Sequence, residues 1–211
     1  MAKLVTRILN KSIYLLFSLL KLHVLCDMVI NNYHEFKVKA VSKTFKNVGN
    51  GFYLSRDFQI KNPQYMSFGN NVSAGERFRI EAWDQYGSQR FAPLIEIGNN
   101  VCFNTDIHIG CINHIYIGDN VLFASRIYIT DHHHGEPVSK MLAISPRHRP
   151  LVSKGPVIIE DNVWIGEGVA IMPGVIIGEN SIIATNSVVT KDIPPNSVAA
   201  GIPARVIKTI M

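Results

Sequence analysis

A six-residue repeat of apolar side chains is the feature that most constrains how this chain folds. From residue 48 onward, an apolar residue returns at every sixth position within short runs, and longer intervals separate the runs. The next position is repeatedly Gly or Ala, and asparagine-rich turns follow it. The apolar positions are Val48, Leu54, Ile60, Phe68, Ala74, Ile80, Ile97, Phe103, Ile109, Ile117, Phe123, Ile129, Ile159, Ile165, Ile171, Ile177, Ile183 and Val189.

A period of six excludes an amphipathic helix, which repeats every 3.6 residues, and a simple strand, which alternates every two. Three hexads fit one turn of a three-sided prism, in which each hexad is a short strand and a corner. The apolar residue then points into the prism, and the small residue after it relieves crowding at the corner. Coils that start at residues 48, 68, 97, 117, 159 and 177 predict an all-β fold, a parallel β-helix of about six coils over residues 46–211. Insertions are expected near residues 83–94 and 132–156.

Residues 1–45 are predicted to form a separate helical segment. The stretch from Ile13 to Ile30 is apolar nearly all round a helical wheel, and Lys3, Arg7 and Lys11 precede it. Charges inside it count against a spanning helix, and no small-residue cleavage site follows, so we expect a retained helix. The sequence leaves two uses open: packing on the domain or a sister subunit, and peripheral contact with a membrane surface.

Composition narrows the class of protein further. Lys and Arg number 21 against 16 Asp and Glu, a net charge of +5 without a polybasic tail, so nucleic acid is not an expected partner. The three cysteines form no CxxC pair, which disfavours a zinc ribbon or a disulfide framework and favours a reducing, cytoplasmic compartment. The chain has no GxSxG elbow, Walker loop or HExxH motif.

The repeat and its flanking motifs resemble those of the hexapeptide-repeat acyltransferases. The stretches ITDHHHG, VWIGEG, TKDIPP and AAGIPARVI are similar to those of the sugar and polysaccharide O-acetyltransferase branch, over about residues 95–208. The resemblance implies a left-handed coil and transfer of an acetyl group from acetyl-CoA to a hydroxyl of a sugar or glycan. Surface polysaccharide biosynthesis is the expected setting, and the acceptor could be lipid-linked at the inner membrane face.

The resemblance also implies the residues of the reacting centre. His132 aligns with the general base of the family, and His134 is its rival in the same triplet. The spacing of 20 residues suggests instead that His134 stacks over His114. Asn104 corresponds to a polar residue of the acceptor and oxyanion site, although a plain corner amide explains it equally well. We interpret Asp131 as a turn cap, because adjacent residues rarely face one another.

Coenzyme A is long and anionic, and the C-terminal coils match the cofactor-contacting stretch of the family. The residues carried over by this resemblance are Thr185, Thr190, Lys191, Arg205, Lys208 and Glu167, of which Glu167 departs from the small polar residue often found there. No metal is expected. A homotrimer with active sites between subunits is expected, because one prism leaves flat sides and an open slot.

Two other classes of function compete with this interpretation. A trimeric, carbonic-anhydrase-like zinc lyase uses the same prism, and His108, His114 and residues 132–134 could supply its ligands. The spacing of six between His108 and His114 weakens that alternative. A non-catalytic β-helix binding module is the third interpretation.

Overall fold

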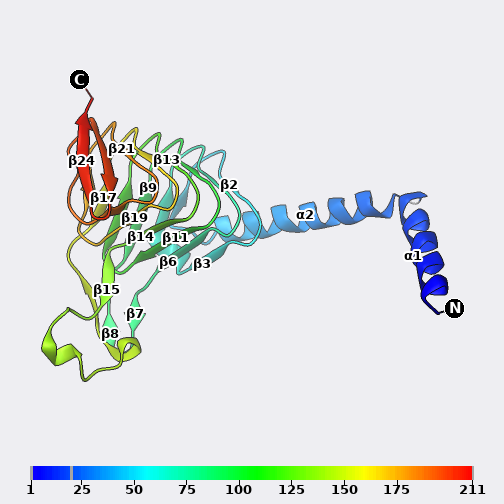
Figure 1. The fold of residues 1–211 in the computed structure, drawn as a ribbon, viewed down its shortest axis with the longest axis horizontal. Coiled ribbons are helices and arrows are strands. Elements are labelled where there is room, and N and C mark those ends of the chain that lie inside the picture. Colours follow the sequence, from blue (N-terminus) through cyan, green and yellow to red (C-terminus); the bar gives the residue numbers. More distant parts are fainter. Residues whose placement is uncertain (1, 20, 211) are drawn as a thin grey trace. The chain divides into compact units, whose positions relative to one another are not determined.

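The computed structural model describes residues 2–19 and 21–210, which form two compact units, 1–43 and 44–211. The N-terminal unit holds two helices, α1 (Ala2–Leu19) and α2 (Leu22–Ser42) (Figure 1). The sequence predicted one continuous helix over Ile13–Ile30. That prediction is wrong at Lys21, whose φ of 47° is left-handed and interrupts the helical hydrogen bonds; Leu20 lies outside the described residues.

The C-terminal unit is built from three parallel sheets whose strands are taken in strict rotation along the chain (Figure 1). The first sheet contains β1 (Asn47–Val48), β4 (Met66–Phe68), β9 (Leu94–Ile97), β12 (His114–Ile117), β17 (Val157–Ile159) and β20 (Ile176–Ile177). The second contains β2 (Tyr53–Leu54), β5 (Ser73–Ala74), β10 (Cys102–Phe103), β13 (Leu122–Phe123), β18 (Trp164–Ile165), β21 (Ile182–Ile183) and β23 (Ser197–Gly201). The third contains β3 (Gln59–Lys61), β6 (Arg79–Ala82), β11 (Ile107–Cys111), β14 (Ile127–Thr130), β19 (Ala170–Ile171) and β22 (Val188–Val189).

This rotation fits a parallel β-helix of six coils, closed at its C-terminal end by β24 (Ala204–Thr209), which pairs antiparallel with β23. The hexad residues fill its interior as predicted. Sixteen of the eighteen are at most 4% exposed, and the half-buried exceptions, Val48 and Ile60, belong to the first coil, which has a neighbouring coil on one side only. A second inward set two residues earlier, including Val101 and Val121, is also buried.

The corners show why small residues and asparagines recur. A Cβ on Gly69 would lie 2.6 Å from the carbonyl carbon and oxygen of Gly98 in the next coil, closer than real side chains approach. From the second coil onward, the residue three positions after the inward residue of the first sheet is an asparagine with a φ of 56–59°. Side-chain hydrogen bonds between these asparagines link successive coils; they include Asn71, Asn100, Asn120 and Asn162.

Every interval longer than six falls at one corner, between the third sheet and the first. The insertion after β6 forms a hairpin of β7 (Gln85–Tyr86) and β8 (Gln89–Arg90). The insertion after β14 forms β15 (His132–His134) and β16 (Leu151–Ser153), with short 3-10 turns at Ser139–Met141 and Pro146–His148 between them. A further turn, Pro63–Tyr65, follows β3 at the same corner.

We predict that Gly69→Ala lowers the free energy of unfolding by about 2 kcal/mol, because the new Cβ forces adjacent coils apart. Urea unfolding followed by fluorescence measures the change. Gly87→Asn is the matched control, since Gly87 has open space around it and a φ of 57° that asparagine tolerates; it should stay within about 0.5 kcal/mol of the native protein. Equal effects from the two substitutions would contradict the close-packed corner.

Candidate active site

His132 stands where the chain leaves the prism for its longest insertion, and its imidazole is held by the residue before it. Its Nδ1 lies 2.9 Å from Oδ1 of Asp131 and 3.2 Å from Oγ1 of Thr130. The His132 side chain is 13% exposed and the Asp131 side chain is fully buried. Because a carboxylate only accepts, Nδ1 carries the hydrogen of this bond. Nε2 is thereby left as the basic nitrogen.

Asp131 does more than the turn cap that we expected from the sequence. Its carboxylate accepts backbone N–H bonds from Ile112, at 2.9 Å, and Asn113, at 2.7 Å, and a bond from the thiol of Cys111, at 3.2 Å. It therefore caps the neighbouring coil and orients His132 at once. The expectation that adjacent side chains would not meet is wrong here, because His132 turns out of the prism while Asp131 stays beneath the corner.

The thiol of Cys111 is buried, and its surroundings disfavour the reactive thiolate form. Burial, followed by the nearby Asp131 carboxylate, raises the pKa of the Cys111 thiol far above its usual range. A thiol held in its protonated form donates to Asp131 and is a poor nucleophile. Its full burial makes Cys111 part of the packed interior.

A cavity of about 180 Å³ lies beside His132, on the outer side of the third sheet. A chain of polar contacts runs along it: Arg79 is 2.8 Å from Glu81, and the same Glu81 oxygen is 3.3 Å from Nε2 of His108. Burial, then the charge of Arg79, lowers the pKa of His108, while Glu81 opposes both. His108 is therefore neutral at pH 7. The lining residues are Arg79, Glu81, Trp83, Tyr86, His108, Gly110, Tyr128, His132, His134 and Leu151.

The other two histidines of the triplet occupy different surroundings. His134 lines the same cavity, where its ring meets Tyr86 edge to face at 5.3 Å and its Nδ1 lies 3.4 Å from the Tyr86 hydroxyl. The predicted stack of His134 over His114 is wrong, because β15 pairs with β16 outside the prism whereas His114 lies in β12 and contacts Glu96 at 3.0 Å. His133 is half-buried, and burial, then the charge of Lys154, lowers its pKa.

The remaining predicted residues lie along two edges of the prism. Thr190 and Lys191 follow β22, on the edge that His132 occupies and two strand spacings away, or about 10 Å. The edge between the second and third sheets carries exposed Asn104 and Thr185 and half-buried Glu167, which pairs with Arg126 at 2.7 Å. Arg205 and Lys208 are exposed on β24. Within one chain, the cavity therefore brings His132 and His134 together but none of the others.

Metal binding by the histidines finds no support within one chain. His108 and His114 each contact a separate glutamate, and the described residues contain no grouping of three or more His, Cys, Asp or Glu side chains that could hold a metal ion.

Comparison with known proteins settles the family. The family described as bacterial transferase hexapeptide (six repeats) matches residues 156–191. A protein of Escherichia coli strain K12 named "Putative lipopolysaccharide biosynthesis O-acetyl transferase WbbJ" is 38% identical over 154 residues, which cover 71% of this chain and 74% of that protein. The chain is a hexapeptide-repeat acyltransferase of the sugar O-acetyltransferase branch.

Solved structures agree with this assignment. A maltose O-acetyltransferase from Clostridium difficile 630 is 32% identical and superposes with a TM-score of 0.57, covering 84% of this acyltransferase and 76% of that chain. A hexapeptide-repeat acetyltransferase of Vibrio cholerae O1 biovar eltor, solved with acetyl coenzyme A, shares the fold at 23% identity and a TM-score of 0.52, covering 84% of this chain and 78% of that one.

Sequence reasoning missed several residues around His132. It considered His108 only as a zinc ligand, and it did not consider Arg79, Glu81, Tyr86 or Tyr128. Arg79, His108 and Tyr128 share one register across β6, β11 and β14, so outward positions of the third sheet could have been read from the hexad alignment. Tyr86 lies in an insertion, for which the repeat gives no register.

Proposed function

We propose that this acyltransferase moves the acetyl group of acetyl-CoA to a hydroxyl of a sugar or glycan, with Nε2 of His132 as general base. The buried Asp131–His132 pair at the mouth of a polar cavity is the observation that carries the proposal. Nε2 takes the proton as the acceptor oxygen attacks the thioester carbon. The carbon–sulfur bond then breaks, Nε2 returns the proton to the sulfur, and the products are an acetyl ester and free coenzyme A.

Asp131 gives His132 the tautomer and charge balance that this step needs. Its bond to Nδ1–H keeps the lone pair on Nε2, and the carboxylate stabilises the imidazolium that forms when the proton arrives. His134 instead contacts the neutral hydroxyl of Tyr86, and among the described residues no carboxylate pairs with it. The arrangement favours His132 over His134 as the base.

The C-terminal coils would hold acetyl-CoA. Thr190 and Lys191 extend the edge of His132 along the prism, and exposed Arg205 and Lys208 at its end offer cations for the phosphates. Thr185 and Glu167 line the other edge, and the ion pair with Arg126 restricts Glu167. The Vibrio cholerae acetyltransferase, which was solved with acetyl coenzyme A on the same fold, supports acetyl-CoA as the co-substrate.

The split of candidate residues between two edges favours a homotrimer of left-handed β-helices. A threefold ring can place the edge that carries Asn104 in one subunit against the edge that carries His132 in the next. Exposed apolar side chains on one column of the second sheet, Tyr53, Leu122 and Trp164, offer the surface that such an assembly buries. The left-handed coil is the hand that the resemblance to this family implies.

The acceptor setting that we propose is surface polysaccharide biosynthesis at the cytoplasmic face of the membrane. The similarity to WbbJ supports a glycan acceptor, and the N-terminal unit supports the location. On α1, Lys3, Arg7 and Lys11 lie on one face, and exposed apolar residues that include Leu9 (54% exposed) and Leu16 (56%) lie on the other. Such a helix binds an anionic membrane surface by its apolar face.

Membrane spanning is a separate matter. No single helix among the described residues is long and apolar enough to cross a membrane, although α1 from Val5 and α2 together, bent by 65°, meet the length and composition requirement.

Replacing the base tests the reaction. His132→Ala should lower the rate of acetyl transfer to a sugar acceptor by about a hundredfold to ten-thousandfold, with an unchanged circular dichroism spectrum. Lys191→Ala is the control: because Lys191 lies away from the reacting centre, it should raise the KM for acetyl-CoA and leave kcat nearly unchanged. An inactive His134→Ala enzyme beside a fully active His132→Ala enzyme would show that His134 is the base.

Mixing two inactive variants tests whether a site is shared between subunits. His132→Ala and Asn104→Ala chains should each be impaired, and a mixed trimer should regain one intact site, or about a third of native activity. Sedimentation should give a trimeric mass. A mixture of His132→Ala with His132→Gln is the control and should stay inactive. If the first mixture also stays inactive, or if Asn104→Ala is fully active alone, the shared site is refuted.

Flotation with liposomes tests the N-terminal helix. The full-length protein should float with vesicles that contain anionic phosphatidylglycerol and stay below neutral phosphatidylcholine vesicles. Reversing the three cations of α1 to Glu should abolish flotation, and Leu9→Asp with Leu16→Asp should weaken it by disrupting the apolar face. If all these proteins stay soluble with both kinds of vesicle, the helix serves packing.

A further inference from the structure

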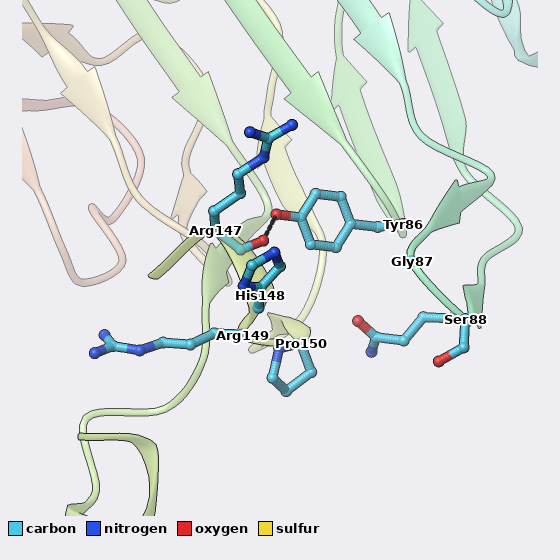
Figure 2. Close-up of a pocket in the computed structure, with 8 residues that line it drawn as sticks. Tyr86, Gly87, Ser88, Arg147, His148, Arg149 and Pro150 are labelled. Carbon is cyan, nitrogen blue, oxygen red and sulfur yellow. Dashed lines mark hydrogen bonds between the residues drawn. The ribbon is translucent and has the colours of Figure 1, made fainter. Parts of the chain in front are cut away.

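A second cavity, of about 650 Å³, opens between the two insertions (Figure 2). One wall is the hairpin turn from Tyr86 to Gln89, and the other is the segment from Arg147 to Pro150. Figure 2 shows the Tyr86 ring reaching across to the main chain of Arg147, whose carbonyl accepts a bond from the Tyr86 hydroxyl. The Gln89 amide bonds both the N–H and the carbonyl of Leu151, at 2.7 and 3.1 Å. These contacts hold the two walls together.

This cavity adjoins the reacting centre through a shared residue. Tyr86 lines both cavities, and its ring and hydroxyl contact His134, which lies with His132 in the smaller one. An acceptor whose hydroxyl reaches His132 can therefore extend past Tyr86 into the larger space. Tyr86 therefore stands at the boundary between the two cavities.

The larger cavity has a cationic wall. The 132–156 insertion contains Lys140, Arg147, Arg149 and Lys154 against one carboxylate, Glu136. No carboxylate lies within 4 Å of the Arg147 guanidinium among the described residues. Across the cavity, the acidic residue of the hairpin, Asp84, is already engaged by Asn62 and Tyr65. Positive charge at this wall is therefore not balanced by the protein.

The two arginines differ in what else they do. Nε of Arg149 donates to the Ile144 carbonyl at 2.9 Å, so Arg149 helps to shape the insertion. Arg147 is exposed, and its hydrogen bond with the Tyr86 hydroxyl is made by its main-chain carbonyl and not by its guanidinium. Replacing the Arg147 side chain therefore removes charge and leaves the Tyr86 contact in place.

We propose that this cavity is a subsite for an anionic group of the acceptor, either the carboxylate of an acidic sugar or a phosphate that links the sugar to its carrier. A guanidinium offers paired N–H donors that match either oxyanion, and Arg147 is the main ligand. Ser88 lines the opposite wall of the cavity. This inference rests on the proposed acetyl transfer and makes its substrate class an anionic glycan unit.

The test compares three small probes by ligand-observed NMR: methyl β-glucoside, methyl β-glucuronide and glucose 1-phosphate. The anionic probe that fits should bind the native protein more tightly than the neutral one, and the affinity should fall as salt rises. Arg147→Gln should weaken binding of that anion by about tenfold or more and leave the neutral probe unchanged. Lys140→Gln, on the same insertion but outside the lining, is the matched control and should bind like the native protein.

The outcomes separate the two proposals. Selective loss of glucuronide binding identifies a carboxylate subsite, and selective loss of glucose 1-phosphate binding identifies a phosphate subsite. Equal binding of all three probes, or anion binding that survives Arg147→Gln, overturns the subsite. Binding is read without catalysis, so a native protein that binds the anion through Arg147 but acetylates none of the probes or larger glycans would count against the proposed function alone.

Discussion

The close approach of successive coils is the constraint on which the rest of this structure depends. Strands in adjacent coils lie about 4.8 Å apart, and at several corners the main chains leave no room for a side chain. Gly69, which a single Cβ would drive into the carbonyl of Gly98, shows how little room remains. The inward residues fill the interior on the same spacing; the rings of Phe103 and Phe123, for example, stack at 4.7 Å. A prism packed in this way has no internal space for a substrate.

The site must therefore be built outside the prism, and it forms where the repeat is interrupted. All the added residues fall at the corner between the third and first sheets, so successive insertions lie beside one another in space. Gln89, for example, contacts Leu151, which follows it by 62 positions in the chain. The short interruption between the hexads of Ile109 and Ile117 also contributes to the site. The turn at Ile112 and Asn113 presents two N–H groups to buried Asp131, and Asp131 in turn holds His132.

The same architecture explains how one fold supports both a precise reacting centre and a variable acceptor surface. His132 is fixed by a buried carboxylate that is anchored to the main chain of a neighbouring coil, and such anchoring gives a general base its orientation. The larger cavity is instead bounded by exposed loop residues, such as Ser88 and Arg147, which can change without disturbing the inward residues of any coil. Under the proposed function, the fixed Asp131–His132 pair would carry the chemistry, and the exposed loops of the same corner would carry the specificity.

The sequence by itself determined the prism, because the period of six, the inward apolar residue and the small residue after it are all local consequences of stacking coils. It also placed His132 at the start of an insertion, and its motifs identified the family. Only the tertiary structure decided that Asp131 meets His132, that His134 turns to Tyr86 instead of stacking on His114, and that the two insertions contact each other. Those contacts depend on how irregular segments fold against one another, and a repeat assigns no register to the residues that interrupt it.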